Sequence, residues 1–265
     1  MINIISTHFG DDFYIKALIR NLYEVKLLPQ NKLYIINNSS QELIIEDKNI
    51  IILKFVTPFT GGLQHSVGLN LCIKKVLKKE GKGKILVLDS DVILKKNIDW
   101  NQFFLSQSKI FNATLAMEYG SRVLTHSCFM YFDGVKIGDI DFLDGSYNFG
   151  FDSGRLIGYN LSKKYKVNKL FGERQKRLRF GDFYLNCSVF HLTSASLSYM
   201  PSRVVKNSFN RLLGINLRKQ IYLVMSDKFT ISKSAKIKIY FVAIFSSFQL
   251  ILKSKFNLLP RKYTN

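Results

Sequence analysis

The stretch Ile85-Leu86-Val87-Leu88-Asp89-Ser90-Asp91 decides the fold of this chain. Four aliphatic residues, bounded upstream by Gly81 and Gly83, are typical of a buried strand in a parallel sheet. Two carboxylates follow at its carboxyl end, where open α/β sheets place their ligands. In an extended chain Asp89 and Asp91 share a face, roughly 6.6 Å apart. Both can then reach one divalent cation, or one can bind the ion while the other contacts a ribose hydroxyl. The alternative is a pair of solvated turn residues.

The segments upstream of this strand alternate between strands and helices. Strands are expected at Ile2–Ser6, Leu33–Ile36 and Ile50–Phe55. Apolar residues at helical spacing predict helices across Ile15–Val25 and Leu69–Leu77. This β-α-β-β-α-β order predicts an α/β fold with a mostly parallel central sheet flanked by helices.

The pattern is looser after Asp91. Further strands are expected at Leu115–Glu118 and Cys128–Phe132, a helix at Leu156–Lys164, and a short strand or turn at Ser188–Leu192. The segment between Gly134 and Gly158 is rich in glycine and aspartate, so we expect it to loop around a site.

The composition is that of a folded, strongly basic protein. Of the 265 residues, 47% are hydrophobic, which excludes a disordered chain, and the net charge is +20. Three scattered cysteines without a CxxC spacing indicate neither a zinc motif nor a disulfide framework. The first residues enter a strand directly and lack the features of a signal peptide, so we expect a cytoplasmic location.

The positive charge is concentrated at the carboxyl end. Residues 201–265 hold thirteen lysines and arginines against Asp227 alone, which is +12 of the total +20. Nucleic acid, anionic lipid and phosphate-bearing substrates are all candidate partners for such a surface. We expect residues 1–200 to form a catalytic domain and residues 201–265 a basic, amphipathic helical extension.

Within this extension, Ile239–Leu252 is an apolar run of 14 residues. A spanning helix needs about 20, so the run is expected not to cross a bilayer. An apolar helix flanked by lysines can lie in the membrane interface, on the inner face of the cell membrane. It can also pack on the catalytic domain or on a dimer partner; the surrounding charge favours anionic lipid.

The ordered motifs resemble those of the GT-A-fold glycosyltransferases, in particular the inverting family 2 of bacterial polysaccharide synthesis. The resemblance covers roughly residues 1–195. It is carried by Ile5–Phe9 at the opening strand, Ile35–Ser40 at the family's "VVDNGS" segment, Leu86–Asp91 at the D-x-D strand, Ser127–Phe132 at the acceptor-side strand, Phe151–Tyr159 at the helix start that carries the catalytic acid, and Phe190–Leu192 at the late histidine. Asn37 stands where the family has the aspartate that reads the base, which leaves the base undetermined.

The resemblance implies a role for each matching residue. Asp91 is expected to be the principal ligand of Mn²⁺ or Mg²⁺, Asp89 to bind the ribose or a metal-bound water, and His191 to complete the metal site. His191 can equally be a hydrogen-bonded core histidine. The donor nucleotide is expected to contact Thr7, Asn38, Ser39, Asp89, Ser90 and Asp91.

Asp152 matches the position of the family's general base. Phe151 replaces the glutamate that commonly precedes it, so the assignment depends on one carboxylate. A partly buried aspartate can accept the proton of an acceptor hydroxyl once burial raises its pKa. Asp152 can also be a helix N-cap. Asp144 is the competing base and is otherwise a turn residue.

Four further features have weaker claims. His65, after the loop expected at Thr60-Gly61-Gly62, can reach the donor but reads better as an exposed loop histidine. Glu118 can contact the acceptor sugar or be a charged residue at a strand end. His126, just before the strand Ser127–Phe132, is equally ambiguous between a site residue and a structural one. The basic cluster of Arg174, Lys176, Arg177 and Arg179 is either a lid over the diphosphate or, more simply, a solvated surface.

These features together predict a metal-dependent hexosyltransferase (class EC 2.4). We expect it to be inverting and to move a sugar from a nucleotide-sugar, a UDP-sugar above all, to a glycan or lipid-linked glycan acceptor. One alternative is a nucleotidyltransferase acting on sugar phosphates, although Thr7-His8-Phe9-Gly10-Asp11 is not the Gly-rich phosphate loop such enzymes normally show. The other is a nucleic-acid-binding protein, but no such motif is visible, so no nucleic-acid partner is expected.

Overall fold

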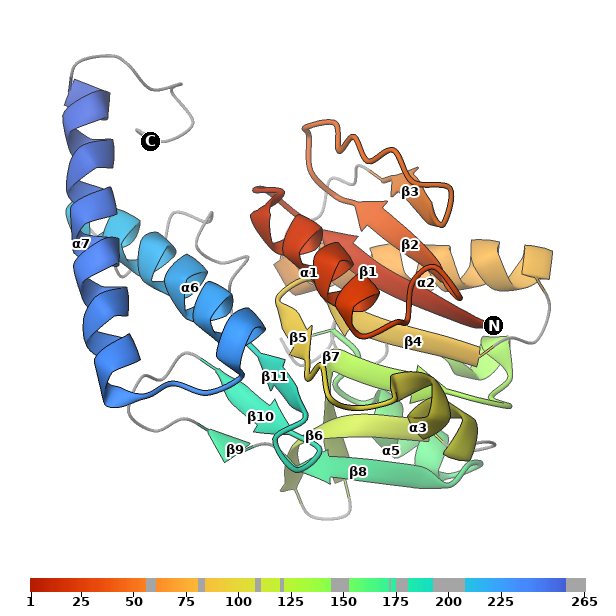
Figure 1. Cartoon of the computed structure of the whole chain (residues 1–265). Helices are drawn as coiled ribbons and strands as arrows, with labels where there is room; N and C mark the ends of the chain where they lie inside the picture. The colour runs from red at the N-terminus through yellow and green to blue at the C-terminus, as the bar shows by residue number, and fades with distance from the viewer. Residues whose placement is uncertain are drawn as a thin grey trace. The chain divides into compact units, whose positions relative to one another are not determined.

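The computed structural model describes residues 1–55, 61–80, 84–107, 111–119, 122–143, 153–171, 173–174, 181–192 and 208–255 (Figure 1). The chain divides into two compact units. The first holds residues 1–175 and 182–191, and the second holds residues 176–181 and 192–265. The division predicted after residue 200 therefore falls within the second unit.

The first unit is built on a seven-stranded sheet. Its spatial order is β3 (Ile50–Lys54), β2 (Lys32–Asn37), β1 (Ile2–His8), β4 (Lys84–Asp89), β7 (Arg122–Phe132), β6 (Phe111–Tyr119) and β8 (Val167–Phe171). Only β7 runs antiparallel to its neighbours β4 and β6, and the other paired strands are parallel. The predicted mostly parallel α/β sheet is confirmed, and the D-x-D strand is the fourth strand, as expected.

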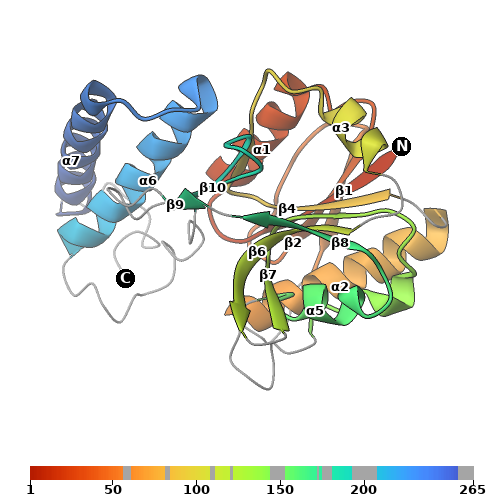
Figure 2. The ribbon, with the colours of Figure 1, turned by 90° about the horizontal axis from the view of Figure 1, so that it is seen from below.

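Helices cover both faces of this sheet (Figure 2). Helices α1 (Phe13–Glu24) and α3 (Trp100–Ser106) pack on one face, and α2 (Gly61–Glu80) and α5 (Ile157–Ser162) pack on the other. The side chains of β4 alternate between the two cores: Leu86 and Leu88 join the α1 side, whereas Ile85 and Val87 join the α2 side. Burial on both faces explains why the strand reads as a continuous apolar run.

A second, four-stranded antiparallel sheet lies beyond the D-x-D turn. It has the order β5 (Val92–Leu94), β11 (Val189–His191), β10 (Asp182–Tyr184) and β9 (Glu173–Arg174). Strand β11 confirms the short strand expected around residues 188–192. Its partner β5 begins directly after Asp91, so this sheet brings a late segment of the chain to the D-x-D motif.

The described part of the second unit is a pair of helices, α6 (Ser208–Lys228) and α7 (Lys233–Lys255), that pack on each other. Asn216 of α6 donates a hydrogen bond to the hydroxyl of Ser247 in α7, 3.0 Å away. Ser247 and Ala243 are fully buried, and small side chains at such a contact let two helices approach closely.

Helix α7 is longer than the 14-residue apolar run on which its prediction depended. The 21 residues Lys233–Lys253 form a helical stretch that is long and apolar enough to cross a membrane, by length and composition alone. The helix thus extends beyond the 14-residue run, and the expectation that the segment does not cross a bilayer stays a prediction. Core helices of soluble proteins pass the same test when they are buried, but only 17% of this stretch is buried.

Candidate functional site

The carboxyl ends of β1, β2 and β4 meet at one edge of the sheet. From β1 the chain proceeds outward through β2 and β3, then returns to place β4 on the other side of β1. The switch point of the topology, where open α/β sheets bind ligands, thus lies between β1 and β4. Thr7 and Asp89 are register partners across it. Both are partly exposed, so both lie where a ligand can reach them.

Asp89 and Asp91 converge on one histidine. Asp89 is the last residue of β4, and Ser90 and Asp91 form a turn before β5. The sequence prediction assumed an extended chain through the motif, whereas the chain turns at Ser90 and Asp91. Even so, Asp89 Oδ2 lies 3.5 Å from His191 Nε2, and Asp91 Oδ1 lies 3.2 Å from the same nitrogen. Ser90 is half-buried between them.

Strand pairing explains how His191 reaches this position. In the β5–β11 ladder His191 is paired with Val92, the residue after Asp91. On its other side His191 is paired with Asp182 of β10. Because β5 is fully buried and β11 is held on both edges, the imidazole has little freedom to leave the carboxylates.

The electrostatics of this triad suit a cation. Burial lowers the pKa of His191, but Asp91 and Cys128 together outweigh burial and raise that pKa well above its usual value. Asp89 Oδ1 is buried without a hydrogen-bond partner among the described residues. Ligand atoms of Asp89, Asp91 and His191 all lie within 4.8 Å of one another. Two carboxylates and one imidazole are donors that Mn²⁺ or Mg²⁺ accepts, so these residues fit the predicted metal.

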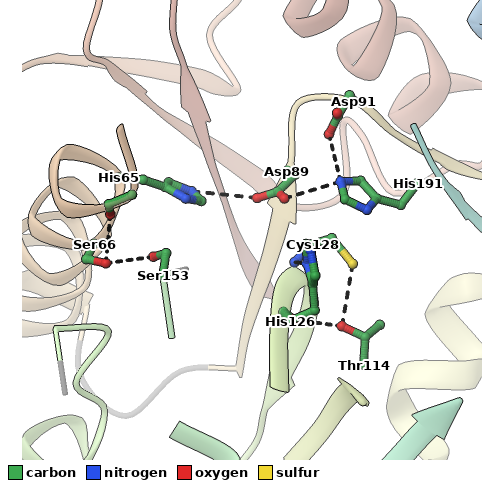
Figure 3. Close-up of polar contacts among 10 residues, drawn as sticks. His65, Ser66, Asp89, Asp91, Thr114, His126, Cys128, Ser153 and His191 are labelled. Carbon is green, nitrogen blue, oxygen red and sulfur yellow. Dashed lines mark hydrogen bonds and ion pairs between the residues drawn. The ribbon is translucent and has the colours of Figure 1, made fainter. Parts of the chain in front are cut away.

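His65 belongs to the same site. It lies in α2, whose first turn begins at Gly61, and not in an exposed loop as expected. Its Nε2 is 3.6 Å from Asp89 Oδ1, and its side chain is only 22% exposed. Figure 3 shows Asp89 lying between His65 on one side and His191 on the other. The sequence signal that was missed is the helical register that turns His65 toward the end of β4.

The predicted base, Asp152, lies outside the described residues, but its neighbour Ser153 is held by a hydrogen bond to Ser66. Ser153 and Ser66 are both buried, and their hydroxyl oxygens are 3.0 Å apart (Figure 3). Ser66 is the residue after His65 in α2. Gly154 has φ +67°, and an added Cβ would lie 2.8 Å from Phe142, so only glycine is accommodated after Ser153. The chain next to Asp152 is thus tied to the helix that carries His65.

The predicted base-reading segment forms a closed turn at the end of β2. Asn37 Oδ1 accepts a hydrogen bond from the Ser39 N–H at 2.9 Å, and Asn37 Nδ2 donates to the Gln41 carbonyl at 2.9 Å. The amide that stands in place of the family's aspartate is therefore occupied in holding the turn. Ser39 and Asn38 are buried, and the Asn38 amide lies against Gly68 of α2. Their contact with a nucleotide stays a prediction.

A second group of side chains, His126, Cys128 and Thr114, lies beside His191. The rings of His126 and His191 are in edge contact, with centroids 4.9 Å apart. Cys128 is fully buried beside them, and Thr114 Oγ1 lies 3.4 Å from its Sγ. Burial raises the pKa of Cys128, but His191 and His126 lower it to about 7. The scattered cysteines had given no reason to place one here, although the His126-x-Cys128 spacing puts both on one face of a strand.

The remaining weak candidates cannot be placed. Glu118 lies in β6 and Arg174 in β9, and neither side chain is described. Asp144, Lys176, Arg177 and Arg179 lie outside the described residues. Their predicted roles at the acceptor or over the diphosphate stay predictions.

Comparison with known proteins gives only distant matches. No protein-family model and no curated protein matches the sequence. Among solved structures, the chain resembles the galactosyltransferase LgtC in complex with donor and acceptor sugar analogues, with 12% identity, a TM-score of 0.42, and coverage of 63% of this chain and 72% of that one. A glycosyltransferase involved in the glycosylation of the major capsid of PBCV-1 matches with 14% identity, a TM-score of 0.39, and coverage of 63% of this chain and 80% of that one.

The matches also include a nucleotidyltransferase. A putative glucose-1-phosphate thymidylyltransferase from Bacillus anthracis has 12% identity, a TM-score of 0.40, and coverage of 64% of this chain and 87% of that chain. At TM-scores this low the matches carry no argument about activity. The assignment to the α/β class follows from the strand order, and the case for function follows from the side chains at the switch point.

Proposed function

We propose that this protein is a metal-dependent glycosyltransferase of GT-A type. It moves a hexosyl group from a nucleotide-sugar, a UDP-sugar being the expected donor, to a hydroxyl of a glycan or lipid-linked glycan. The observation that carries the proposal is the convergence of Asp89, Asp91 and His191 at the switch point of the sheet. Burying two carboxylates beside an imidazole is costly unless a ligand compensates for it.

The described residues provide the donor half of the reaction. Mn²⁺ or Mg²⁺ would be held by Asp91, Asp89 and His191. Asp91 would be the principal ligand, because its carboxylate is closer to His191 Nε2 than that of Asp89 and is more buried. Such a cation would supply Lewis-acid stabilisation of the charge on the leaving nucleoside diphosphate. Thr7, across the switch point from Asp89, and Ser90, in the turn, contact the donor, and Asn38 and Ser39 lie at the end of the adjacent strand.

Asp152 serves as the general base in this proposal. An inverting transfer requires a base on the face of the sugar opposite to the leaving group, where it accepts the proton of the attacking hydroxyl. The Ser66–Ser153 hydrogen bond supports this role, because it ties the residue next to Asp152 to the helix that carries His65.

The test measures metal-dependent donor binding and then turnover. In a thermal-shift panel of UDP-, GDP-, CMP- and dTDP-sugars, one donor should raise the melting temperature in the presence of Mn²⁺, since a ligand of the native state stabilises it. Asp91→Ala should abolish this shift and reduce release of the nucleoside diphosphate by at least ~100-fold.

Asp133→Asn is the matched control, because Asp133 pairs with Lys84 at the opposite end of β4. This variant should leave both the thermal shift and the release of the nucleoside diphosphate unchanged. Unchanged donor binding by Asp91→Ala would refute the metal assignment. Release of pyrophosphate from a nucleoside triphosphate and a sugar phosphate would instead establish a nucleotidyltransferase.

We also propose that α7 docks on the inner face of the cell membrane from the cytoplasm. One stripe of the helix is buried, and the other presents exposed apolar side chains that no described residue covers: Ile237, Tyr240, Phe241, Ile244, Phe245, Phe248 and Leu252. Lysines at positions 233, 236, 238, 253 and 255 flank this stripe. Apolar area between cationic ends is complementary to an anionic bilayer surface, where a lipid-linked acceptor would be found.

A further inference from the structure

Cys128 differs from an ordinary buried cysteine in what surrounds it. Such residues usually pack as small apolar groups. Cys128 is instead surrounded by polar groups: its Sγ is 3.4 Å from Thr114 Oγ1, its side chain is hydrogen-bonded by the Tyr184 hydroxyl, and its own N–H donates to His126 Nδ1 at 3.2 Å. Polar groups around a fully buried sulfur make it a candidate ligand.

An irregularity of the sheet brings His126 and Cys128 together. Strands β6 and β7 pair regularly up to Ala113 and Met130, but the next residue of β6, Thr114, is paired with His126. The extra residues of β7 therefore bulge at the carboxyl end of β4. Bulges next to functional sites redirect side chains, and this one turns both His126 and Cys128 toward His191.

The third member is His191, whose second nitrogen is not used by the carboxylates. Its Nε2 faces Asp89 and Asp91, whereas its Nδ1 is buried, and the His191 ring also interacts with the Cys128 side chain. Ligand atoms of His126, Cys128 and His191 lie within 4.8 Å of one another.

We propose that His126, Cys128 and His191 form a binding site for Zn²⁺, distinct from the Asp89–Asp91 pair. One thiolate and two imidazoles are a donor set that zinc takes in tetrahedral coordination, with the fourth position left to water. Mg²⁺ does not favour thiolate, so the two sites differ in the metal they select. On binding, a Zn–S bond forms and the thiol proton passes to the solvent.

Because His191 belongs to both groups, the two sites compete. Zinc bound at His191 Nδ1 leaves the proton of the neutral imidazole on Nε2, so Nε2 cannot at the same time bind a cation of the Asp89–Asp91 pair. Zinc is therefore expected to weaken Mn²⁺ binding there. Any resulting inhibition of glycosyl transfer rests on the proposed function, whereas the zinc site itself does not.

Cobalt(II) provides a direct test, since a thiolate ligand gives Co²⁺ a near-ultraviolet charge-transfer band. The full-length wild-type protein, reduced and freed of metal, is titrated with Co²⁺ and then with Zn²⁺. We expect one equivalent of Co²⁺ to produce the band and Zn²⁺ to remove it. Cys128→Ser should abolish the band, and His126→Gln should weaken Co²⁺ binding by at least ~10-fold.

The other two cysteines supply matched controls. Cys72→Ser and Cys187→Ser should retain the full band, because Cys72 lies in α2 and Cys187 is exposed in the loop before β11. Asp91→Asn should also retain it, even if no sugar is ever transferred, so the failure of this site and the failure of the proposed function are distinguishable.

The proposal is overturned if folded wild-type protein gives no charge-transfer band, or if the band persists in Cys128→Ser. Wild-type protein decides the first point whether or not a variant folds. Mn²⁺ binding followed by electron paramagnetic resonance completes the test. One equivalent of Zn²⁺ should weaken it in wild type and not in Cys128→Ser, and equal weakening in both would refute the shared His191.

Discussion

The side chain at position 152 tests the chemistry of the proposed transfer most directly. Asp152→Asn preserves size and hydrogen-bonding capacity but cannot accept the acceptor's proton. We expect the thermal shift produced by the donor to remain and turnover to fall by about 10²–10⁴-fold, the usual contribution of a general base. Full activity in Asp152→Asn would show that another residue is the general base. Asp144 is the competing candidate, so Asp144→Asn would be measured next.

Single residues show where sequence reasoning reached its limit. Asp89 and Asp91 could be selected because they follow an apolar strand, and His191 because it matches the late histidine of the resembled family; the structure brings the three together. His65 was misread, because Gly61 and Gly62 suggest a loop but form the first turn of α2. Cys128 was set aside for lack of a partner cysteine. Its partners are histidines, and one of them lies 63 residues away in the chain, beyond the reach of any local spacing rule.

Among the elements, α5 depends on a glycine. A Cβ at Gly158 would lie 2.2 Å from Thr125 Cγ2, and the Thr125 hydroxyl is hydrogen-bonded to the Gly154 carbonyl at 2.8 Å, so it cannot easily move. Gly158→Ala should therefore destabilise the first unit by about 1–3 kcal/mol, despite the better helix propensity of alanine.

The fluorescence of Trp100, the single tryptophan and a fully buried residue of this unit, can follow its denaturation. Gly138→Ala is the control, since nothing lies within 4 Å of an added Cβ there. Its effect should stay within about 0.5 kcal/mol. Equal stability of the two variants would contradict the packing described for α5.

Helix α7 can be tested through its exposed stripe. Phe241 and Phe245 are 71% and 64% exposed, so replacing both with serine should not unfold the helix pair. Each should remove about 1.5–3 kcal/mol of membrane partitioning if the ring is buried in lipid. Co-sedimentation with anionic vesicles should therefore be lost.

Leu105→Ser is the control for α7, because Leu105 is a 61% exposed apolar residue of α3 in the first unit. Binding by the double phenylalanine variant that equals binding by the control would exclude α7 as the membrane contact.

The elements differ in how far the sequence predicted them. Strands β1 to β4 and their helices were predictable, because each carries an uninterrupted apolar run or a helical stripe buried on a sheet face. The reversal of β7 was not, since an apolar strand reads the same in either direction. The β5–β11 pairing was also out of reach, as three-residue strands hold too little pattern to choose a partner.

For the whole molecule, the uneven charge predicts a dependence on salt. The last 65 residues carry +12 of the net +20, so attraction to anionic vesicles should be strong at low ionic strength. The Debye length falls from about 10 Å at 0.1 M to about 3 Å at 1 M salt, which should release most of the protein.

The control for this prediction is a set of neutral vesicles, to which binding should be weaker and nearly independent of salt. Protein that resists both high salt and alkaline carbonate would be integral, which would refute docking at the surface and favour a spanning α7.

The β5–β11 pairing also has a consequence for biosynthesis. Asp91 leaves the ribosome 100 residues before His191 does. At about 5–20 residues per second, the carboxylate pair waits on the order of ten seconds for its imidazole. A nascent or prematurely terminated chain that lacks β11 can complete the central sheet yet cannot assemble the triad. β11, the last strand of the described part of the chain, thus sets when the triad can form.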